Sequence, residues 1–114
     1  MKVAIIGSRN FNDYELVVET LLEYENIITL IVSGGAKGAD MLGERWAKEK
    51  NKELLVFHPD WVKYGKSAGF IRNKDIIENS DIVFAFWDGI SKGTKHSIDL
   101  SVKLNKELKI IKWI

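Results

Sequence analysis

A glycine-rich stretch from Ser33 to Asp40 carries the residue types that bind phosphate groups. It follows an apolar run over 28–32 and precedes apolar residues spaced as on one face of a helix. A strand, a glycine turn and a helix N-terminus in this order direct backbone N–H groups at an anion, and glycines let a ligand approach the main chain. The pattern predicts a phosphate site; a tight turn that merely needs glycines is the alternative. The residues expected to hold the phosphate are Ser33, Gly34, Gly35, Lys37 and Gly38.

Three further segments, each expected at the end of a strand, add hydroxyls, cations and flat rings. Arg9 follows Gly7 and Ser8, and its guanidinium can pair with a phosphate through two hydrogen bonds. Residues 91–94 again combine hydroxyls with a lysine and a glycine, and aromatic rings elsewhere offer a surface for a base. The residues expected to contact the ligand are Gly7, Ser8, Arg9, Ser33, Gly34, Gly35, Lys37, Gly38, Asp40, Trp61, Tyr64, Arg72, Asn73, Trp87, Asp88, Ser91, Lys92, Gly93 and Thr94.

Several of these residues have a second interpretation. Asp40 either favours the positive end of its own helix or accepts a hydrogen bond from a ligand hydroxyl. Trp61 and Tyr64 could fill the core beneath a long loop, and Thr94 could simply be an N-cap. His96 has no carboxylate partner at motif spacing, which favours a surface or capping role over catalysis. Neither the G-x-G-x-x-G pattern nor a P-loop occurs in the sequence, which disfavours classical NAD enzymes and ATPases.

The spacing of apolar residues predicts the elements that must position these side chains. Apolar runs predict strands over 2–6, 28–32, 53–57, 81–87 and 108–114. Helical periodicity predicts four helices. The first begins near Tyr14, the second ends near Lys50, the third spans about 68–79 and the fourth ends near Lys106. Leu22, Phe70 and Val102 are expected on the apolar faces of three of these helices.

Strands that alternate with helices imply right-handed crossovers and a parallel sheet covered on both faces. We therefore predict one α/β domain over residues 1–114, with a Rossmann-like three-layer fold. Its five-stranded parallel sheet is expected in the order 3-2-1-4-5, with helices on both faces. In such a sheet, ligands bind beyond the carboxyl ends of the strands, where the predicted loops would meet.

Composition limits the function. Seventeen basic and sixteen acidic residues give a net charge of +1, which argues against a nucleic-acid partner held by phosphate neutralisation. The absence of cysteine excludes disulfides, zinc fingers and thiol catalysis. No signal-peptide layout or membrane-length apolar run occurs, so we expect a cytoplasmic protein with no membrane partner. No metal site and no certain cofactor are expected, and the apolar end over 110–114 could form a covered edge in a homo-oligomer, a dimer or higher.

Five blocks of this sequence together resemble the YspA-like branch of the SLOG superfamily, which includes the LOG phosphoribohydrolases and the nucleotide-binding core of the DNA-processing protein DprA. The blocks are Gly7-Ser8-Arg9 with Phe11, 33–40, Asp60-Trp61 with Tyr64-Gly65-Lys66, Ala68-Gly69 with Arg72-Asn73, and 85–89 with 91–94. The resemblance implies a Rossmann-like fold that binds a nucleotide-derived ligand across the glycine loops. It also implies a role in sensing or processing nucleotide signals, often in bacterial or phage defence.

Comparison with the LOG signature P-G-G-x-G-T-x-x-E separates binding from catalysis. Gly93-Thr94 matches the G-T pair and Arg72 is the counterpart of the family's arginine, but the glutamate position falls on Ser97. A serine cannot serve as a carboxylate acid or base. The leading hypothesis is therefore capture of an ADP-ribose-like or cyclic nucleotide by a sensor or sequestering protein. One alternative is a hydrolase of an N-glycosidic or phosphate-ester bond, with Arg72, Asp88 and Asp40 as catalytic candidates. The other is DprA-like binding of single-stranded DNA.

Overall fold

Strands and helices alternate along the chain in the computed structural model, which describes residues 1–113. The strands are β1 (Lys2–Gly7), β2 (Leu30–Ser33), β3 (Glu53–Val56), β4 (Ile82–Trp87) and β5 (Glu107–Lys112). The helices are α1 (Tyr14–Leu21), α2 (Ala39–Glu49), α3 (Trp61–Tyr64), α4 (Ala68–Glu78) and α5 (Lys92–Lys103), with short 3₁₀ turns η1 (Leu22–Tyr24) and η2 (Gly65–Ser67).

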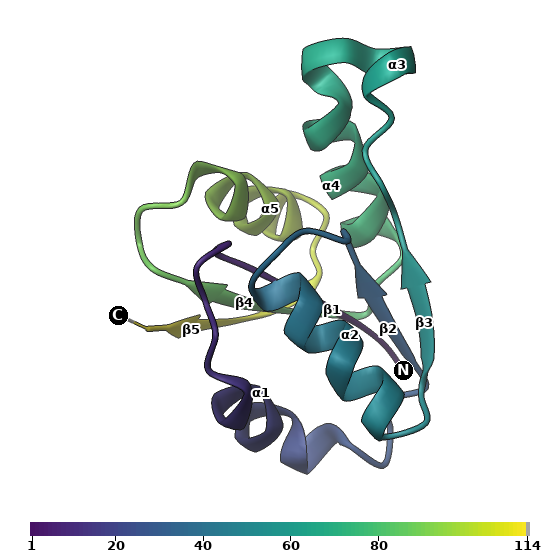
Figure 1. The fold of residues 1–114 in the computed structure, drawn as a ribbon, viewed down its shortest axis with the longest axis vertical. Coiled ribbons are helices and arrows are strands. Elements are labelled where there is room, and N and C mark those ends of the chain that lie inside the picture. Colours follow the sequence, from purple (N-terminus) through teal and green to yellow (C-terminus); the bar gives the residue numbers. More distant parts are fainter. Residues whose placement is uncertain (114) are drawn as a thin grey trace.

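All five strands are parallel and lie in the order β3-β2-β1-β4-β5, which confirms the Rossmann-like fold predicted from the sequence (Figure 1). The strand order reverses between β1 and β4, because the chain moves outward to β3 and then returns to the other side of β1. A crevice forms at such a reversal because the loops after the two neighbouring strands leave in opposite directions.

Both faces of the sheet are covered, which explains why the central strands are continuous apolar runs. On one face, α1 and α2 place Val17 and Trp46 against the sheet, and Phe11 stacks on Phe86 with ring centroids 4.9 Å apart. On the other face, α4 and α5 supply the second cluster of buried side chains (Figure 1). The core members from those two helices are Ile76, Ile77 and Ile98.

Three side chains expected on apolar helix faces are exposed instead. Phe70 is 55% exposed because the start of α4 extends beyond the sheet. Leu22 is exposed because α1 ends at Leu21 and the chain turns into η1. Val102 is exposed although its neighbour Ser101 is buried. The expected strand over 28–32 begins only at Leu30, because Ile28 N donates to the Tyr24 carbonyl at the turn before it.

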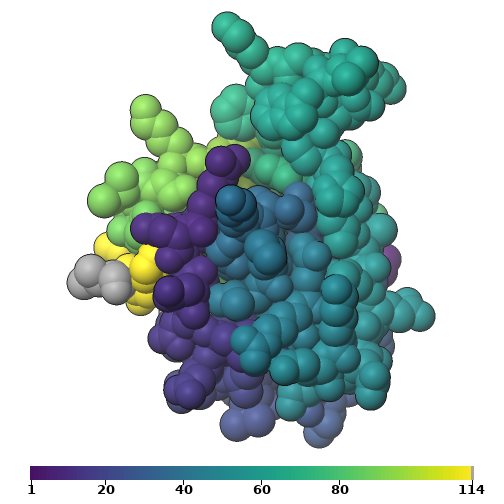
Figure 2. Space-filling model, viewed as in Figure 1, coloured from purple at the N-terminus to yellow at the C-terminus, as the bar shows by residue number. Residues whose placement is uncertain are grey.

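The segment from α3 to the first turn of α4 projects from the body of the molecule (Figures 1 and 2). Trp61 and Tyr64 lie on this projection and are 58% and 40% exposed, so the interpretation of these two rings as core fillers is wrong. The Trp61 ring lies beside Gly69, where an added Cβ would be 3.8 Å from Trp61 Cη2. The projection therefore presents aromatic surface to solvent.

The carboxyl end of the chain forms the edge strand β5. Ile110 is 46% exposed there, whereas Ile111 and Trp113 pack against the core; Ile114 lies outside the described residues. A homo-oligomer built on this edge stays a prediction. Within residues 1–113, no helix is long and apolar enough to cross a membrane, and no cluster of three metal-ligating side chains occurs.

Candidate functional site

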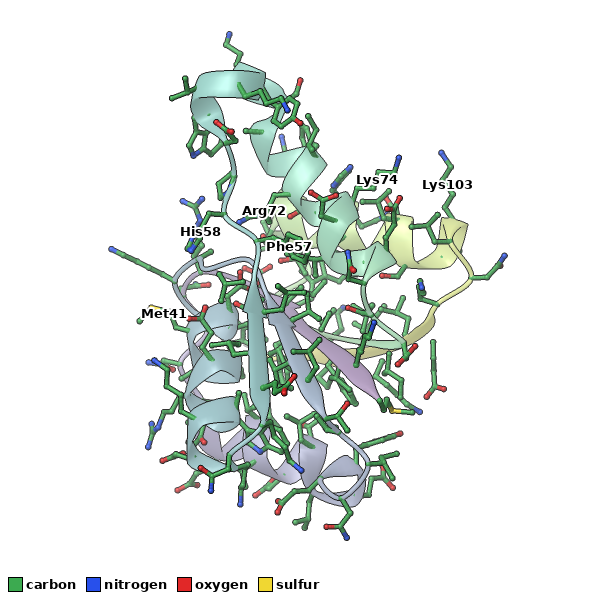
Figure 3. The ribbon with its side chains drawn as sticks, turned by 90° about the vertical axis from the view of Figure 1, so that its right-hand side faces the viewer. Met41, Phe57, His58, Arg72, Lys74 and Lys103 are labelled. Atoms are coloured by element: carbon green, nitrogen blue, oxygen red, sulfur yellow. The ribbon has the colours of Figure 1, made fainter. Side chains whose placement is uncertain are left out.

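A polar cleft with a volume of about 110 Å³ lies at the reversal of strand order, beyond the carboxyl end of β1 and between α4 and α5. The loops after β1, β2 and β4 all contribute to it, as expected for the ligand crevice of this sheet type. Its lining residues are Ile6, Gly7, Arg9, Ala36, Asp40, Arg72, Asn73, Ile76, Ser91, Gly93, Thr94 and Ser97. Figure 3 shows Arg72 at this edge of the sheet near His58, while Lys74 and Lys103 point away from it.

Arg72 connects three parts of the cleft. Its Nη1 donates to the Gly34 carbonyl at 2.6 Å, and its Nε donates to Asn73 Oδ1 at 3.0 Å. The remaining amide group of Asn73 lies 3.3 Å from His96 Nδ1, so this imidazole nitrogen acts as the acceptor. Phe70 packs against the His96 ring with centroids 4.5 Å apart. The chain of contacts fixes α4 to α5 and to the loop after β2.

The charges in the cleft are unequal. Arg9 is exposed and makes no ion pair or side-chain hydrogen bond within residues 1–113, and Arg72 is half-buried. Burial lowers the pKa of Arg72, the charge of Asp40 partly restores it, and the charge of Arg9 lowers it again. Burial raises the pKa of Asp40 to about 7, against the Ala36 N–H and Arg72, which favour its ionised form, while Glu44 adds repulsion. A protonated or half-ionised Asp40 leaves the cleft with a net positive charge.

The loop between β2 and α2 is closed by its own side chains. Gly35 N donates to Ser33 Oγ at 3.2 Å, and Ala36 N donates to Asp40 Oδ2 at 3.3 Å. The Ser33 hydroxyl in turn donates to Glu44 Oε2 at 2.8 Å. Two of the loop's amides are therefore occupied, which the glycine pattern alone does not reveal.

The glycines of this loop allow close packing. A Cβ on Gly34 would lie 2.8 Å from Asp40 Oδ2 and 2.9 Å from Arg72 Nη1. Gly38 has a φ of +82° and fits beneath the Ser8 and Arg9 main chain, where a Cβ would overlap the Ser8 carbonyl oxygen. Ala39 N also donates to that oxygen, so the β1 and β2 loops hold each other in place.

The loop before α5 is organised by Asp88. Its Oδ1 accepts the N–H groups of Ile90 and Ser91, both at 2.8 Å, and these hydrogen bonds lower its pKa. Asp88 N donates to Ser8 Oγ at 3.2 Å, and Trp87 Nε1 donates to the Ser91 carbonyl at 3.0 Å. Asp88 thus shapes the loop from outside the cleft.

The N-terminus of α5 faces the cleft with unused donors. Ser91 is the N-cap residue, which corrects the interpretation of Thr94 as the cap; the two hydroxyls lie 3.2 Å apart. The amides of Lys92, Gly93 and Thr94 have no acceptor within residues 1–113. A Cβ added to Gly93 would meet no atom within 4 Å, so open space lies beside this turn.

The structure brings eight of the sequence-predicted ligand residues into the cleft. They are Gly7, Arg9, Asp40, Arg72, Asn73, Ser91, Gly93 and Thr94. Six others support the loops or lie beside the cleft without lining it: Ser8, Ser33, Gly34, Gly35, Lys37 and Gly38. The remaining five lie elsewhere. Trp61 and Tyr64 lie on the projection, and Asp88 stabilises its own loop. Trp87 and Lys92 line a second hollow of about 410 Å³, together with Ile90 and His96.

Four lining residues are absent from the sequence prediction. Ile6, Ala36 and Ile76 are apolar and carried no chemical signal of their own. Ser97 follows Gly93 and Thr94 by four and three residues on α5, and helical spacing places such residues on one face. That spacing could have identified Ser97 as a lining residue even though it lacks the carboxylate of the LOG signature.

The fold and the cleft define a Rossmann-like α/β protein with a polar cleft at the reversal of strand order. The chain belongs to the YspA, cpYpsA-related SLOG family, whose sequence profile matches residues 1–64, and this confirms the assignment made from the motifs. The Gene 61 protein of Mycobacterium phage D29 is a relative, 36% identical over 104 residues that cover 83% of each chain.

Solved structures share the fold. DNA processing protein A from Helicobacter pylori superposes with a TM-score of 0.77 at 22% identity, over 100% of this chain and 66% of its own. DprA from Streptococcus pneumoniae gives 0.83 at 19% identity, over 99% of this chain and 50% of its own. The structural-genomics protein TM1055 gives 0.68 at 19% identity, over 94% of this chain and 71% of its own. The chain thus spans about half to two thirds of the DprA chains that it matches.

These structures correct one prediction. The near-neutral net charge argues against nucleic-acid partners, yet the protein from Helicobacter pylori, which has this fold, has a single-stranded DNA binding mode. Net charge is the wrong measure because a few cations gathered at one edge of a sheet can hold a phosphate backbone. The exclusion of nucleic acid is therefore withdrawn.

Proposed function

We propose that the cleft binds the phosphate of a nucleotide-derived ligand. The observation that carries this proposal is the convergence of two arginines, Arg9 and Arg72, on the unused amides at the N-terminus of α5. Helix N-termini attract anions, and a guanidinium pairs with phosphate oxygens through two hydrogen bonds. Ser91 and Thr94 add hydroxyls to the same wall. The arrangement suits a phosphate better than any uncharged group.

The phosphate would lie against α5 rather than inside the glycine loop. Gly35 N and Ala36 N already have partners, so the loop after β2 would mainly position Asp40 and Arg72. The base would extend toward the projection. Gly69 lies one helical turn before Asn73, and the exposed Trp61 ring beside Gly69 supplies a stacking surface above the cleft.

Capture is favoured over hydrolysis. Ser97 is buried in the wall of the cleft at the position where a LOG enzyme has its glutamate, so no carboxylate stands there. Among the cleft-lining residues, Asp40 supplies the carboxyl group. The guanidinium of Arg72 beside it donates hydrogen bonds to the Gly34 carbonyl and to Asn73 Oδ1. We therefore propose a sensor or sequestering protein for an ADP-ribose-like or cyclic nucleotide.

Calorimetric titration with AMP, ADP-ribose and cyclic nucleotides tests this proposal. Arg9→Gln should weaken binding by about tenfold or more, because it removes a guanidinium that can pair with the phosphate. The fold should be unaffected, since the Arg9 side chain is exposed and makes no ion pair or side-chain hydrogen bond within residues 1–113. Lys103→Gln is the matched control, since Lys103 is exposed and points away from the cleft (Figure 3). Mass spectrometry of any small molecule released on denaturation would identify the ligand. If none of these compounds binds, the proposal is refuted. If the protein hydrolyses one of them, its function is hydrolysis rather than capture.

A second candidate is binding of single-stranded DNA, favoured by the fold shared with the Helicobacter pylori protein. On this chain, Trp61 and Tyr64 are exposed on the projection, with Lys63 and Lys66 beside them. Exposed rings flanked by cations suit unstacked bases and their backbone. Fluorescence anisotropy with a labelled oligothymidine should then show binding that weakens steeply with salt and is lost in Trp61→Ala. No binding at low salt would reject this candidate.

A further inference from the structure

Asp40 is an unusual component of a cleft otherwise rich in cations, amides and hydroxyls. The residue is only 7% exposed, yet it lines the cleft. No side chain donates to its carboxyl group within residues 1–113, because the nearby guanidinium of Arg72 bonds the Gly34 carbonyl and Asn73. Its contacts are with the main chain, where Ala36 N donates to Oδ2 at 3.3 Å and the Gly34 N–H also favours the ionised form. A carboxyl group has about four acceptor positions, so part of its capacity is unused.

A ligand bound in this cleft must satisfy that acceptor. A phosphate cannot donate to the ionised carboxylate, because its oxygens accept hydrogen bonds and its charge repels that group; from the protonated form it could only accept, which leaves the other carboxyl oxygen without a donor. A hydroxyl group can supply that donor. In a nucleotide, the donors next to the phosphate are the hydroxyls of the ribose, and a carboxylate that accepts from them is a physically sound partner.

We propose that Asp40 accepts a hydrogen bond from a ribose hydroxyl, so that the cleft selects ribonucleotides over their deoxy analogues. This inference rests on the proposed function, since it takes the phosphate against α5 as the anchor. It also separates the two candidate functions. The interior of a single DNA strand has no free sugar hydroxyl, whereas a free ribonucleotide has two.

The structural role of Asp40 does not account for its position. One structural role is to accept a hydrogen bond from Ala36 N–H, which needs only one of the two carboxyl oxygens. The other is to place a negative charge in the first turn of α2, which does not require the side chain to line a cleft. Glu44, one turn later on the same helix, provides the comparison. It accepts a hydrogen bond from Ser33 and does not line the cleft. Glu44 is thus a carboxylate on the same helix that lies outside the cleft lining, and it serves as the control.

Calorimetry with AMP, 2′-deoxy-AMP, 3′-deoxy-AMP and inorganic phosphate tests the inference. The unaltered protein should prefer AMP over at least one deoxy analogue by about ten- to a hundredfold, the range for a hydrogen bond to a charged group. Asp40→Ala removes both carboxyl oxygens, so no side-chain group at this position can bond the ligand hydroxyl; Asp40→Asn would be a poor test, because its NH₂ group could donate to the same hydroxyl. We expect the preference to disappear in Asp40→Ala and to persist in Glu44→Gln.

The outcomes distinguish this inference from the proposed function. If AMP and both deoxy analogues bind the unaltered protein equally, or if the preference survives in Asp40→Ala, Asp40 does not read the sugar and only the inference fails. If neither phosphate nor any nucleotide binds, the proposed function fails and the inference with it. The comparison of ligands on the unaltered protein needs no variant, and the melting temperature of each variant shows whether it folds.

Discussion

Arg72 Nη1 donates to the carbonyl oxygen of Gly34 at 2.6 Å, across 38 residues of sequence. This hydrogen bond joins α4 to the loop after β2, two segments that the sheet alone would not hold together. A guanidinium has five N–H groups, and the two hydrogen bonds to Gly34 and Asn73 leave the others for a ligand. Arg72 therefore combines a structural bond with a charge in the cleft.

Arg72→Lys should destabilise the protein although it keeps the charge. A lysine cannot bond Gly34 and Asn73 in the same geometry, so the free energy of unfolding should fall by about 1–3 kcal/mol. Urea denaturation followed by circular dichroism measures this change. Lys74→Ala on the same helix is the control, because Lys74 is exposed and its ion pair with Glu78 at 3.6 Å contributes little. Equal stability of the two variants would show that the bond to Gly34 is dispensable.

The sequence predicts the sheet well because its central strands are buried on both faces. Runs such as 2–6 and 82–86 can only be central strands when helices alternate with them, and the order follows from the fold class. Phe70 shows the limit of this reasoning. Its place in a helical pattern predicts burial, but periodicity does not indicate where a helix extends past the sheet that it covers.

The cleft is predicted less completely, for a different reason. Glycine, serine and lysine in the stretch 33–38 are the residues of a phosphate loop, and the sequence cannot show that Ser33 and Asp40 occupy two of its amides. The free donors instead lie at Gly93 and its neighbours, where the pattern is weaker. Which amides face a ligand depends on loop conformation, and loop conformation depends on contacts between segments distant in sequence.

Gly38→Ala should disrupt folding for two reasons. A Cβ does not fit at this position, and residues other than glycine rarely adopt its backbone conformation. The φ of +82° is strained for alanine, and the new Cβ would overlap the Ser8 carbonyl oxygen. Together these effects should lower the free energy of unfolding by about 2–5 kcal/mol. Gly65→Ala is the control, since Gly65 has a φ of +56° but a Cβ there would meet nothing within 4 Å. Similar melting temperatures for the two variants would contradict the packing argument.

Gly93→Leu should weaken ligand binding without harming the fold. A side chain at this position enters open space beside the N-terminus of α5, where the phosphate is proposed to bind. We expect binding of AMP to weaken by about tenfold or more, while the melting temperature stays level or rises because glycine disfavours helices by about 1 kcal/mol. Titration calorimetry and thermal denaturation measure the two effects. Unchanged affinity would place the ligand elsewhere, for example in the hollow lined by Trp87 and Ile90.

Asp40→Asn should change how stability depends on pH. Burial raises the pKa of Asp40 to about 7 from its ordinary value of 3.8, so between these values the folded protein binds a proton that the unfolded chain releases. The contribution of Asp40 to stability is therefore fully present below about pH 3.8 and is lost as the pH rises through about 7. Above that pH, the charge stays buried beside Glu44 with only partial compensation from Arg72.

The measurement is the difference in unfolding free energy between the Asp40→Asn variant and the unaltered protein, followed by urea denaturation from about pH 4 to pH 8. The difference should shift in favour of the variant as the pH rises, reaching about 1 kcal/mol or more near pH 8. Asp88 and His96, whose pKa values are lowered, contribute the opposite pH dependence, but they are present in both proteins and cancel in the difference. A difference that is flat across this range would mean that Asp40 titrates like an exposed carboxyl group, and its burial in the cleft would have to be reconsidered.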